Sequence, residues 1–182
     1  MKMTKSILIA AMLLFTLGTY AQDKDDQRVM VDAEKAKTKL MKSNEGLDMF
    51  FENASGYVVF PNVGEGGLIV GGASGNGVLY ENGKPVGMAD LKKLDVGLQA
   101  GGQALTEIIF FETAEALQRF KQDKFEFSAE ATAVALEKGV AANASYNDGV
   151  VVFAKPKKGL MADLSVGGQK FNYTDMENIE KK

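Results

Sequence analysis

The chain has 182 residues, of which 46% are hydrophobic and 25% are charged, and its formal net charge is −3. This length and composition are those of one globular domain with a core of its own. Because the chain has no Cys and no His, disulfides, thiolate nucleophiles, cysteine metal sites and histidine general bases are excluded, and the acidic balance argues against general nucleic-acid binding.

The first 21 residues predict a signal peptide. Lys2 and Lys5 precede an apolar run from Ile7 to Leu17, and Thr19 to Ala21 offers small residues where a signal peptidase reads the chain. The run is shorter than the roughly 20 residues of a membrane span, which favours cleavage after Ala21 over an uncleaved anchor. Cleavage takes the formal charge from −3 to −5 and predicts an exported protein, periplasmic or associated with the outer envelope.

Residues 22–28 are polar and acidic, which predicts a flexible leader. An amphipathic helix is expected next, because apolar residues recur at helical spacing: Val29, Ala33, Ala36 and Leu40. Lysines flank this stripe at positions 35, 37, 39 and 42. A basic amphipathic helix can lie on an anionic membrane, but the narrow, Ala-rich stripe favours packing against the chain's own domain. Leu47 to Phe51 predicts a second short helix.

The stretch from Gly56 to Tyr80 predicts a hairpin of buried strands, with β-branched and aromatic residues interrupted by glycines. Glycine pairs at residues 66–67 and 71–72 predict sharp bends or positive φ, and therefore a strongly curved sheet. Asn82-Gly83 then predicts a two-residue hairpin turn. Pro85 predicts that the strand after this turn lies at an edge of the sheet.

Further strands are expected over residues 96–103 and 105–111, and a helix over Thr113 to Lys121 with Thr113 as its N-cap. Phe125 to Leu136 is ambiguous, because its composition favours a helix while its alternation of residues favours a strand. The unbroken alternation, with small residues on one face, makes a strand the preferred interpretation. The stretch from Gly149 to Gly168 repeats the pattern of the first hairpin (GVVVF for GYVVF, KGL for GGL), which predicts a second, similar hairpin. The last strand is expected over residues 170–173, before a polar, partly helical tail.

These patterns predict a single α+β domain over residues 29–182. Its sheet is expected to be strongly curved and antiparallel, built from several hairpins, and packed with the N-terminal amphipathic helix and a short mid-chain helix.

No catalytic motif, cofactor site or metal site is predicted. The Gly-rich run lacks the spacing of a phosphate-binding loop. Asp23, Asp25 and Asp26 lack the glycine and the terminal glutamate of a calcium loop. Glu126 and Glu130 have no partner motif, so a solvated face is a better interpretation than an acid/base pair. A hydrolase is therefore disfavoured.

Three blocks of sequence resemble the SYLF domain, a lipid-binding module also called the actin-regulator domain. They are GYVVFPNVGEGGLIVGGASGNGVLY, LDVGLQAGGQ followed by FSAEATAVA, and VVVFAKPKKGLMADLSVGGQKF, in that order. The similarity covers about residues 33–175. It implies an α+β fold with a curved antiparallel sheet. Eukaryotic members bind phosphoinositides, some bind actin filaments, and bacterial members are typically exported. The chain departs from the family pattern at Gly83 to Gly87, which has no Trp, and at Gly139 to Ala142.

The candidate site is a cluster of three lysines, Lys155, Lys157 and Lys158, expected at a hairpin tip in an otherwise acidic chain. Lysines near a membrane are attracted to anionic lipid by about 1 kcal/mol each. A turn that is merely solvated is the alternative, and the resemblance favours lipid headgroups as partners. The sequence therefore predicts a non-catalytic envelope protein that binds lipid or a membrane surface. The alternative function is a structural or protein-interaction module without a lipid ligand.

Overall fold

A computed structural model of the chain describes residues 24–66, 70–96, 103–128, 131–137, 141–157 and 165–179. The predicted signal peptide (1–21) lies outside these residues. The first element is a helix that covers residues 24–43, called here the N-terminal helix. It includes residues 24–28, which the sequence assigned to a flexible leader, because polar and charged side chains are compatible with the exposed sides of a helix.

The other elements follow in chain order. The helices are α2 (Leu47–Asn53), α3 (Ala114–Lys121) and α4 (Met176–Ile179), with a short 3-10 turn at Ala141–Asn143. The strands are β1 (Gly56–Gly66), β2 (Val70–Glu81), β3 (Lys84–Val96), β4 (Gln103–Phe111), β5 (Val134–Ala135), β6 (Val150–Pro156) and β7 (Lys170–Asp175).

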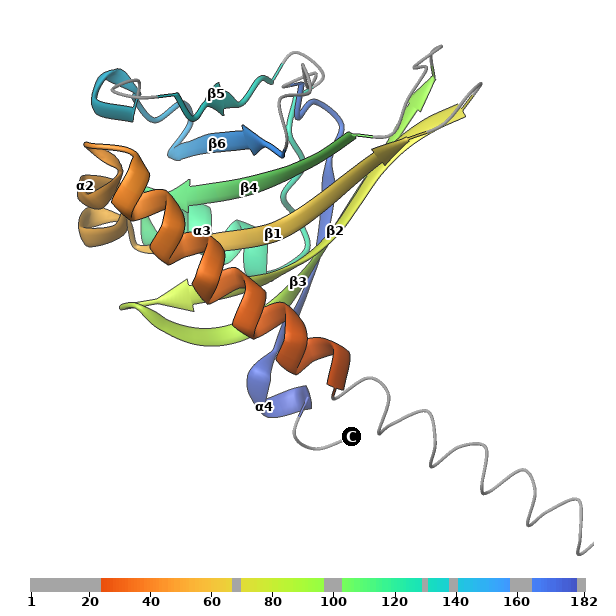
Figure 1. Cartoon of the computed structure of the whole chain (residues 1–182). Helices are drawn as coiled ribbons and strands as arrows, with labels where there is room; N and C mark the ends of the chain where they lie inside the picture. Colours follow the sequence, from red (N-terminus) through yellow and green to blue (C-terminus); the bar gives the residue numbers. More distant parts are fainter. Residues whose placement is uncertain are drawn as a thin grey trace, which may run out of the picture.

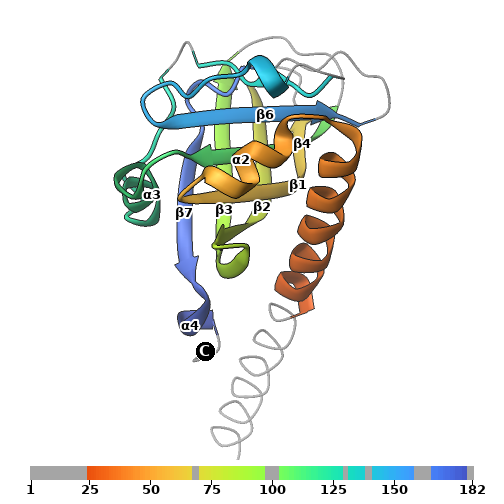
Figure 2. The same cartoon turned by 90° about the vertical axis from the view of Figure 1, so that its left-hand side faces the viewer.

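The seven strands form one sheet in the order β5-β6-β4-β1-β2-β3-β7. All neighbouring strands are antiparallel except β5, which runs parallel to β6. The predicted α+β class with a curved sheet is confirmed, and β5 makes the sheet mixed rather than purely antiparallel. Figure 2 shows how far the sheet turns, since β4 and β6 run steeply across the direction of β3 and β7.

A bulge in β1 contributes to the curvature of the sheet. The register of β1 shifts between Val59 and Asn62 against β2, and between Phe60 and Val63 against β4. Opposite this bulge, a Cβ on Gly77 would lie 2.6 Å from the Phe60 ring, and one on Gly75 would lie 2.8 Å from the Asn62 carbonyl oxygen. Because bulges bend strands and glycines permit close approach, the bend requires glycine at these two positions.

The predicted hairpin of Gly56 to Tyr80 is confirmed by the pairing of β1 with β2. The Asn82-Gly83 turn is also confirmed, with φ of 50° and 75° at its two central residues. The inference from Pro85 was wrong, because β3 lies between β2 and β7. Pro85 is tolerated there since pairing with β7 begins only at Gly87.

Two other expectations have different outcomes. Within the described residues, β6 is flanked by β4 and β5, rather than by a hairpin partner of its own. The segment 125–137, as far as it is described, is neither a helix nor a regular strand. It is mainly irregular, with bridges from Glu126 to Lys170 and from Thr132 to Ser165 and the two-residue strand β5, so it crosses the opening between the two edges of the sheet.

The two faces of the sheet carry separate cores. The inner face packs against α3 and the segment 125–137, through residues that include Phe60, Phe111, Phe120 and Phe171. The outer face packs against α2 and the N-terminal helix, through residues that include Phe50, Phe110 and Phe153. Figure 1 shows the N-terminal helix lying across the sheet. Its apolar stripe is buried at Ala33 and Leu40, as the sequence predicted.

Candidate functional site

The predicted lysine site begins at the end of β6. Val150 to Ala154 are buried, which fixes this strand in the sheet between β4 and β5. Lys155 and Lys157 follow at the edge of the buried region, and both are only partly exposed. Lys158 lies outside the described residues. The described residues of the predicted site, Lys155 and Lys157, therefore continue directly from a strand that is held in the sheet.

Both lysines are held by neutral groups. The ammonium of Lys155 lies 3.5 Å from the hydroxyl oxygen of Ser43, at the end of the N-terminal helix. The ammonium of Lys157 donates to the side-chain carbonyl of Asn62 on β1, and its backbone N–H donates to the Ala104 carbonyl at 2.8 Å. These contacts hold the ammonium groups through neutral partners, which do not cancel their charges.

The N-terminal helix adds further lysines beside the β6 end. Its solvent face forms a shallow groove, lined in the described residues by Val31, Glu34, Lys35, Thr38, Lys39, Lys42 and Ser43. Ser43 belongs to this groove and also contacts Lys155, so the groove and the β6 end are continuous. Figure 2 shows β6 ending beside the last turns of the helix. We call Lys35, Lys39, Lys42, Lys155 and Lys157 together the cationic surface.

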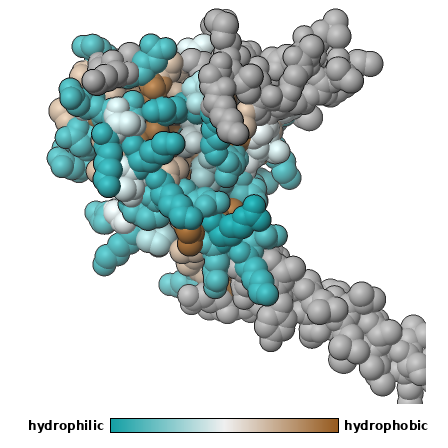
Figure 3. Space-filling view, viewed as in Figure 1, coloured by the Kyte–Doolittle hydropathy of each residue, from teal (hydrophilic) through white to brown (hydrophobic). Residues whose placement is uncertain are grey.

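The sequence did not predict this combination. From the sequence, the helix lysines are separate from Lys155 and Lys157, called here the β6 lysines. Nothing in the sequence indicates that Ser43 and Lys155, which are 112 positions apart, come into contact. The face over the helix is mainly hydrophilic in the space-filling view (Figure 3). Val31 is its main exposed apolar side chain, at 52% exposure.

The electrostatics of this surface are unbalanced. Burial lowers the pKa of Lys157 below its usual value, Asp32 opposes this effect, and the nearby positive charge of Lys39 lowers the pKa further. Asp32 also lies 3.7 Å from Lys35, which it partly neutralises. Glu34, which lines the groove, pairs with Lys37 at 2.9 Å, so lysines outnumber carboxylates on this surface.

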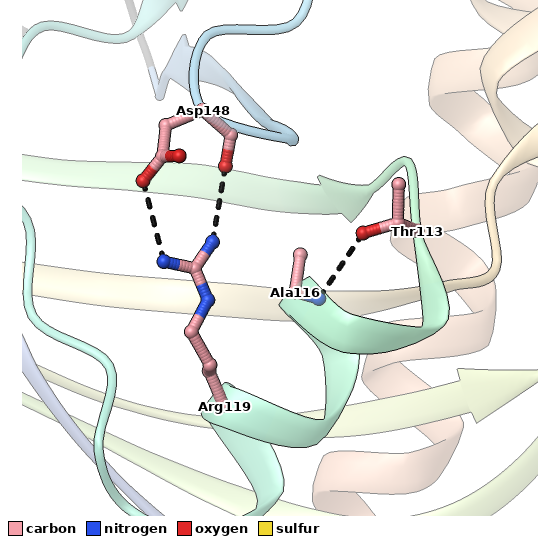
Figure 4. A network of polar contacts seen from close by, with 4 residues as sticks. All are labelled: Thr113, Ala116, Arg119 and Asp148. Carbon is pink, nitrogen blue, oxygen red and sulfur yellow. Dashed lines mark hydrogen bonds and ion pairs between the residues drawn. The ribbon is translucent and has the colours of Figure 1, made fainter.

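The described residues carry no constellation that supports catalysis. Glu126 is paired with Lys170 at 3.5 Å, and Glu130 lies outside the described residues. No group of three or more acidic side chains in the described part could hold a metal ion. A second groove lies between α3, the segment 125–134 and β6, where Arg119 donates to the Asp148 carboxylate at 3.3 Å and to its backbone carbonyl at 3.2 Å (Figure 4). Lys124 and Glu126 also line this groove, so its basic and acidic side chains balance and it has no net positive charge.

No helix among the described residues combines the length and the apolar character needed to cross a membrane.

Two comparisons with known proteins bear on this surface. A family model, Ysc84, described as Las17-binding protein actin regulator, matches residues 92–180. Beta cell expansion factor A of Aeromonas veronii is 28% identical over 141 residues, which are 76% of this chain and 53% of that protein. The chain thus spans about half the length of this relative. The family match includes β6 and its lysines but not the N-terminal helix.

Proposed function

We propose that the chain, which is similar to the SYLF family of binding modules, is a non-catalytic, exported protein that binds lipid at a membrane surface of the cell envelope. Anionic headgroups contact Lys155, Lys157 and Lys158 in this proposal, and the helix lysines of the cationic surface extend the contact.

The observation that carries the proposal is the contact of Lys155, at the end of β6, with Ser43 of the N-terminal helix. A chain with a formal charge of −3 gathers five lysines there from two elements. At about 1 kcal/mol for each lysine close to anionic lipid, such a set supplies a few kcal/mol of affinity. Because exposed charges are screened beyond about 8 Å at physiological ionic strength, this affinity depends on salt.

The experiment compares the parent protein with a variant in which Lys155, Lys157 and Lys158 are changed to Gln. Binding to vesicles containing phosphatidylserine or phosphatidylglycerol should weaken, and the difference should shrink as salt rises. Vesicles of phosphatidylcholine alone provide the neutral control.

A matched charge control changes three exposed lysines elsewhere, Lys84, Lys124 and Lys170, to Gln. This control alters the net charge by the same amount and should retain most of the binding. If both triple variants bind anionic vesicles as tightly as the parent does at low salt, Lys155, Lys157 and Lys158 belong to a solvated turn that does not contact lipid. Native mass spectrometry of the purified protein, with a co-purifying lipid as the expected result, gives an independent reading.

A protein-interaction module of the envelope is the second candidate. The matching family model is described as Las17-binding protein actin regulator, which supports protein binding by the same fold. Failure of the parent protein to bind anionic vesicles at low salt, with no lipid in native mass spectra, would favour this candidate.

Export is a separate part of the proposal, supported by the sequence of the first 21 residues. Protein recovered from the envelope fraction should begin at Gln22. A chain that still begins at Met1 in that fraction would identify the segment as an anchor.

A further inference from the structure

Asn62 lies at the bulge of β1, where the strand bends. The buried hydroxyl of Thr106 donates to the Pro61 carbonyl at 3.2 Å, which ties the bulge to β4. Phe60 and Val63 both pack in the inner core despite their odd spacing, because the bulge adds a residue between them. Asn62 is consequently exposed next to two buried residues.

This position brings the Asn62 amide to Lys157. The Asn62 side-chain carbonyl accepts a hydrogen bond from the Lys157 ammonium, and the backbone N–H of Lys157 is held by Ala104 at 2.8 Å. The lysine is therefore fixed at both ends. An amide, unlike a carboxylate, fixes the ammonium without cancelling its charge.

The fixed ammonium stands near another positive charge. Lys39 of the N-terminal helix is close enough to disfavour the charged form of Lys157, while Asp32 favours it. Two like charges held near each other cost free energy, and an anionic group that contacts both removes this cost. The order imposed by Asn62 also removes part of the entropy that a free lysine loses on binding.

We propose that Asn62 is a positioning residue of the cationic surface, which holds the Lys157 ammonium in place at the end of β6 so that a phosphate-bearing group of an anionic lipid surface contacts it. The inference rests on the proposed function. It adds Asn62 to the proposed site. Because this residue is uncharged, the charge pattern of the sequence does not indicate it.

The test uses two substitutions of opposite character in the full chain. Asn62→Ala frees the ammonium and should weaken binding to phosphatidylserine vesicles by roughly two- to tenfold, the ratio given by the ordering cost of one long side chain. Its dependence on salt should stay that of the parent, because no charge changes. Asn62→Asp keeps the shape but neutralises Lys157 in place, so it should weaken binding and also reduce the salt dependence.

Two controls isolate these effects. Asn76→Ala changes the exposed residue directly opposite Asn62 on β2 and should bind as the parent does. Asn172→Asp adds the same negative charge at an exposed position on β7 and should have a smaller effect than Asn62→Asp. Parent-like binding by both Asn62 variants would overturn the proposal.

A measurement without lipid separates this inference from the proposed function. The NMR order parameter of the Lys157 ε-methylene group should fall in Asn62→Ala and stay unchanged in Asn76→Ala. An unchanged order parameter in Asn62→Ala refutes the positioning role, whatever the vesicles show. If the order parameter falls but the parent protein does not bind vesicles, the ligand assignment fails and the positioning of Lys157 stands.

Discussion

The side-chain amide of Gln169 donates a hydrogen bond of 3.1 Å to a carboxylate oxygen of Glu107, and both residues are only 1% exposed. Glu107 lies on β4, where strand alternation directs it to the inner face with Leu105 and Ile109. Gln169 precedes β7, which lies four strands away in the sheet order. This hydrogen bond therefore ties the segment before β7 across the inner face of the curved sheet.

Gln169→Leu should lower the free energy of unfolding by about 1–3 kcal/mol, because it removes a buried donor from a buried carboxylate. Chemical denaturation monitored by circular dichroism measures the change. Asn172→Leu, at an exposed position on β7, is the control and should change stability by less than about 0.5 kcal/mol. Equal stabilities for the two variants would show that the hydrogen bond does not contribute.

Gly72→Val should destabilise the protein by about 1 kcal/mol or more. A Cβ at Gly72 would lie 2.8 Å from the Lys93 carbonyl oxygen on β3, and backbone cannot move aside cheaply. Gly64→Val is the matched strand control, since a Cβ at Gly64 meets no atom within 4 Å. Thermal midpoints that fall equally in both variants would point to a general loss from replacing glycine, rather than to close approach at Gly72.

Residues 56–83 show why much of the fold is predictable from the sequence. The alternation of residue types, the glycines between the apolar runs and the Asn82-Gly83 pair are local signals. The β1–β2 hairpin and the turn that follows it form where these signals predict them. At the glycine pairs, Gly66 and Gly72 face each other in the ladder, and Gly67 lies outside the described residues. Among the described glycines, positive φ is found at Gly46, Gly83, Gly149 and Gly168.

The cationic surface was less predictable, for a physical reason. Its charges are visible in the sequence, but their juxtaposition depends on how the N-terminal helix packs on the outer face. That packing uses small residues such as Ala33, together with the placement of Lys37 over the Tyr80 ring at 4.9 Å. The contact of Ser43 with Lys155 is a long-range result of this packing, and the contact of Asn62 with Lys157 is a long-range result of the sheet; no local pattern encodes either.

Thr113→Ala should lower stability by about 1 kcal/mol. The Thr113 hydroxyl accepts a hydrogen bond of 3.2 Å from the Ala116 N–H at the start of α3 (Figure 4), and loss of such a cap has a typical cost of this size. Thr113→Ser keeps the hydroxyl and should retain most of the stability, as judged by urea midpoints. Should the serine variant lose as much as the alanine variant, the methyl group rather than the cap would be responsible.

Tyr146 provides the last prediction, which concerns stability at high pH. Burial raises the pKa of Tyr146 from 10.0 to about 12, and the nearby Glu112 carboxylate adds to the effect. Burial also raises the pKa of Tyr57, Tyr80 and Tyr173.

A tyrosine whose pKa is higher in the folded state than in the unfolded state binds more protons when folded above pH 10. Its contribution to stability is complete below pH 10 and is lost as the pH rises from 10 to about 12 for Tyr146. The free energy of unfolding should therefore fall over this range.

Tyr146→Phe removes one such group, so it should lose less stability between pH 9 and pH 11 than the parent does. Absorbance at 295 nm should show tyrosine ionisation above pH 10 in the native protein and near pH 10 in denaturant. Identical pH profiles for the parent and Tyr146→Phe would mean that Tyr146 ionises as easily in the folded chain as in the unfolded one.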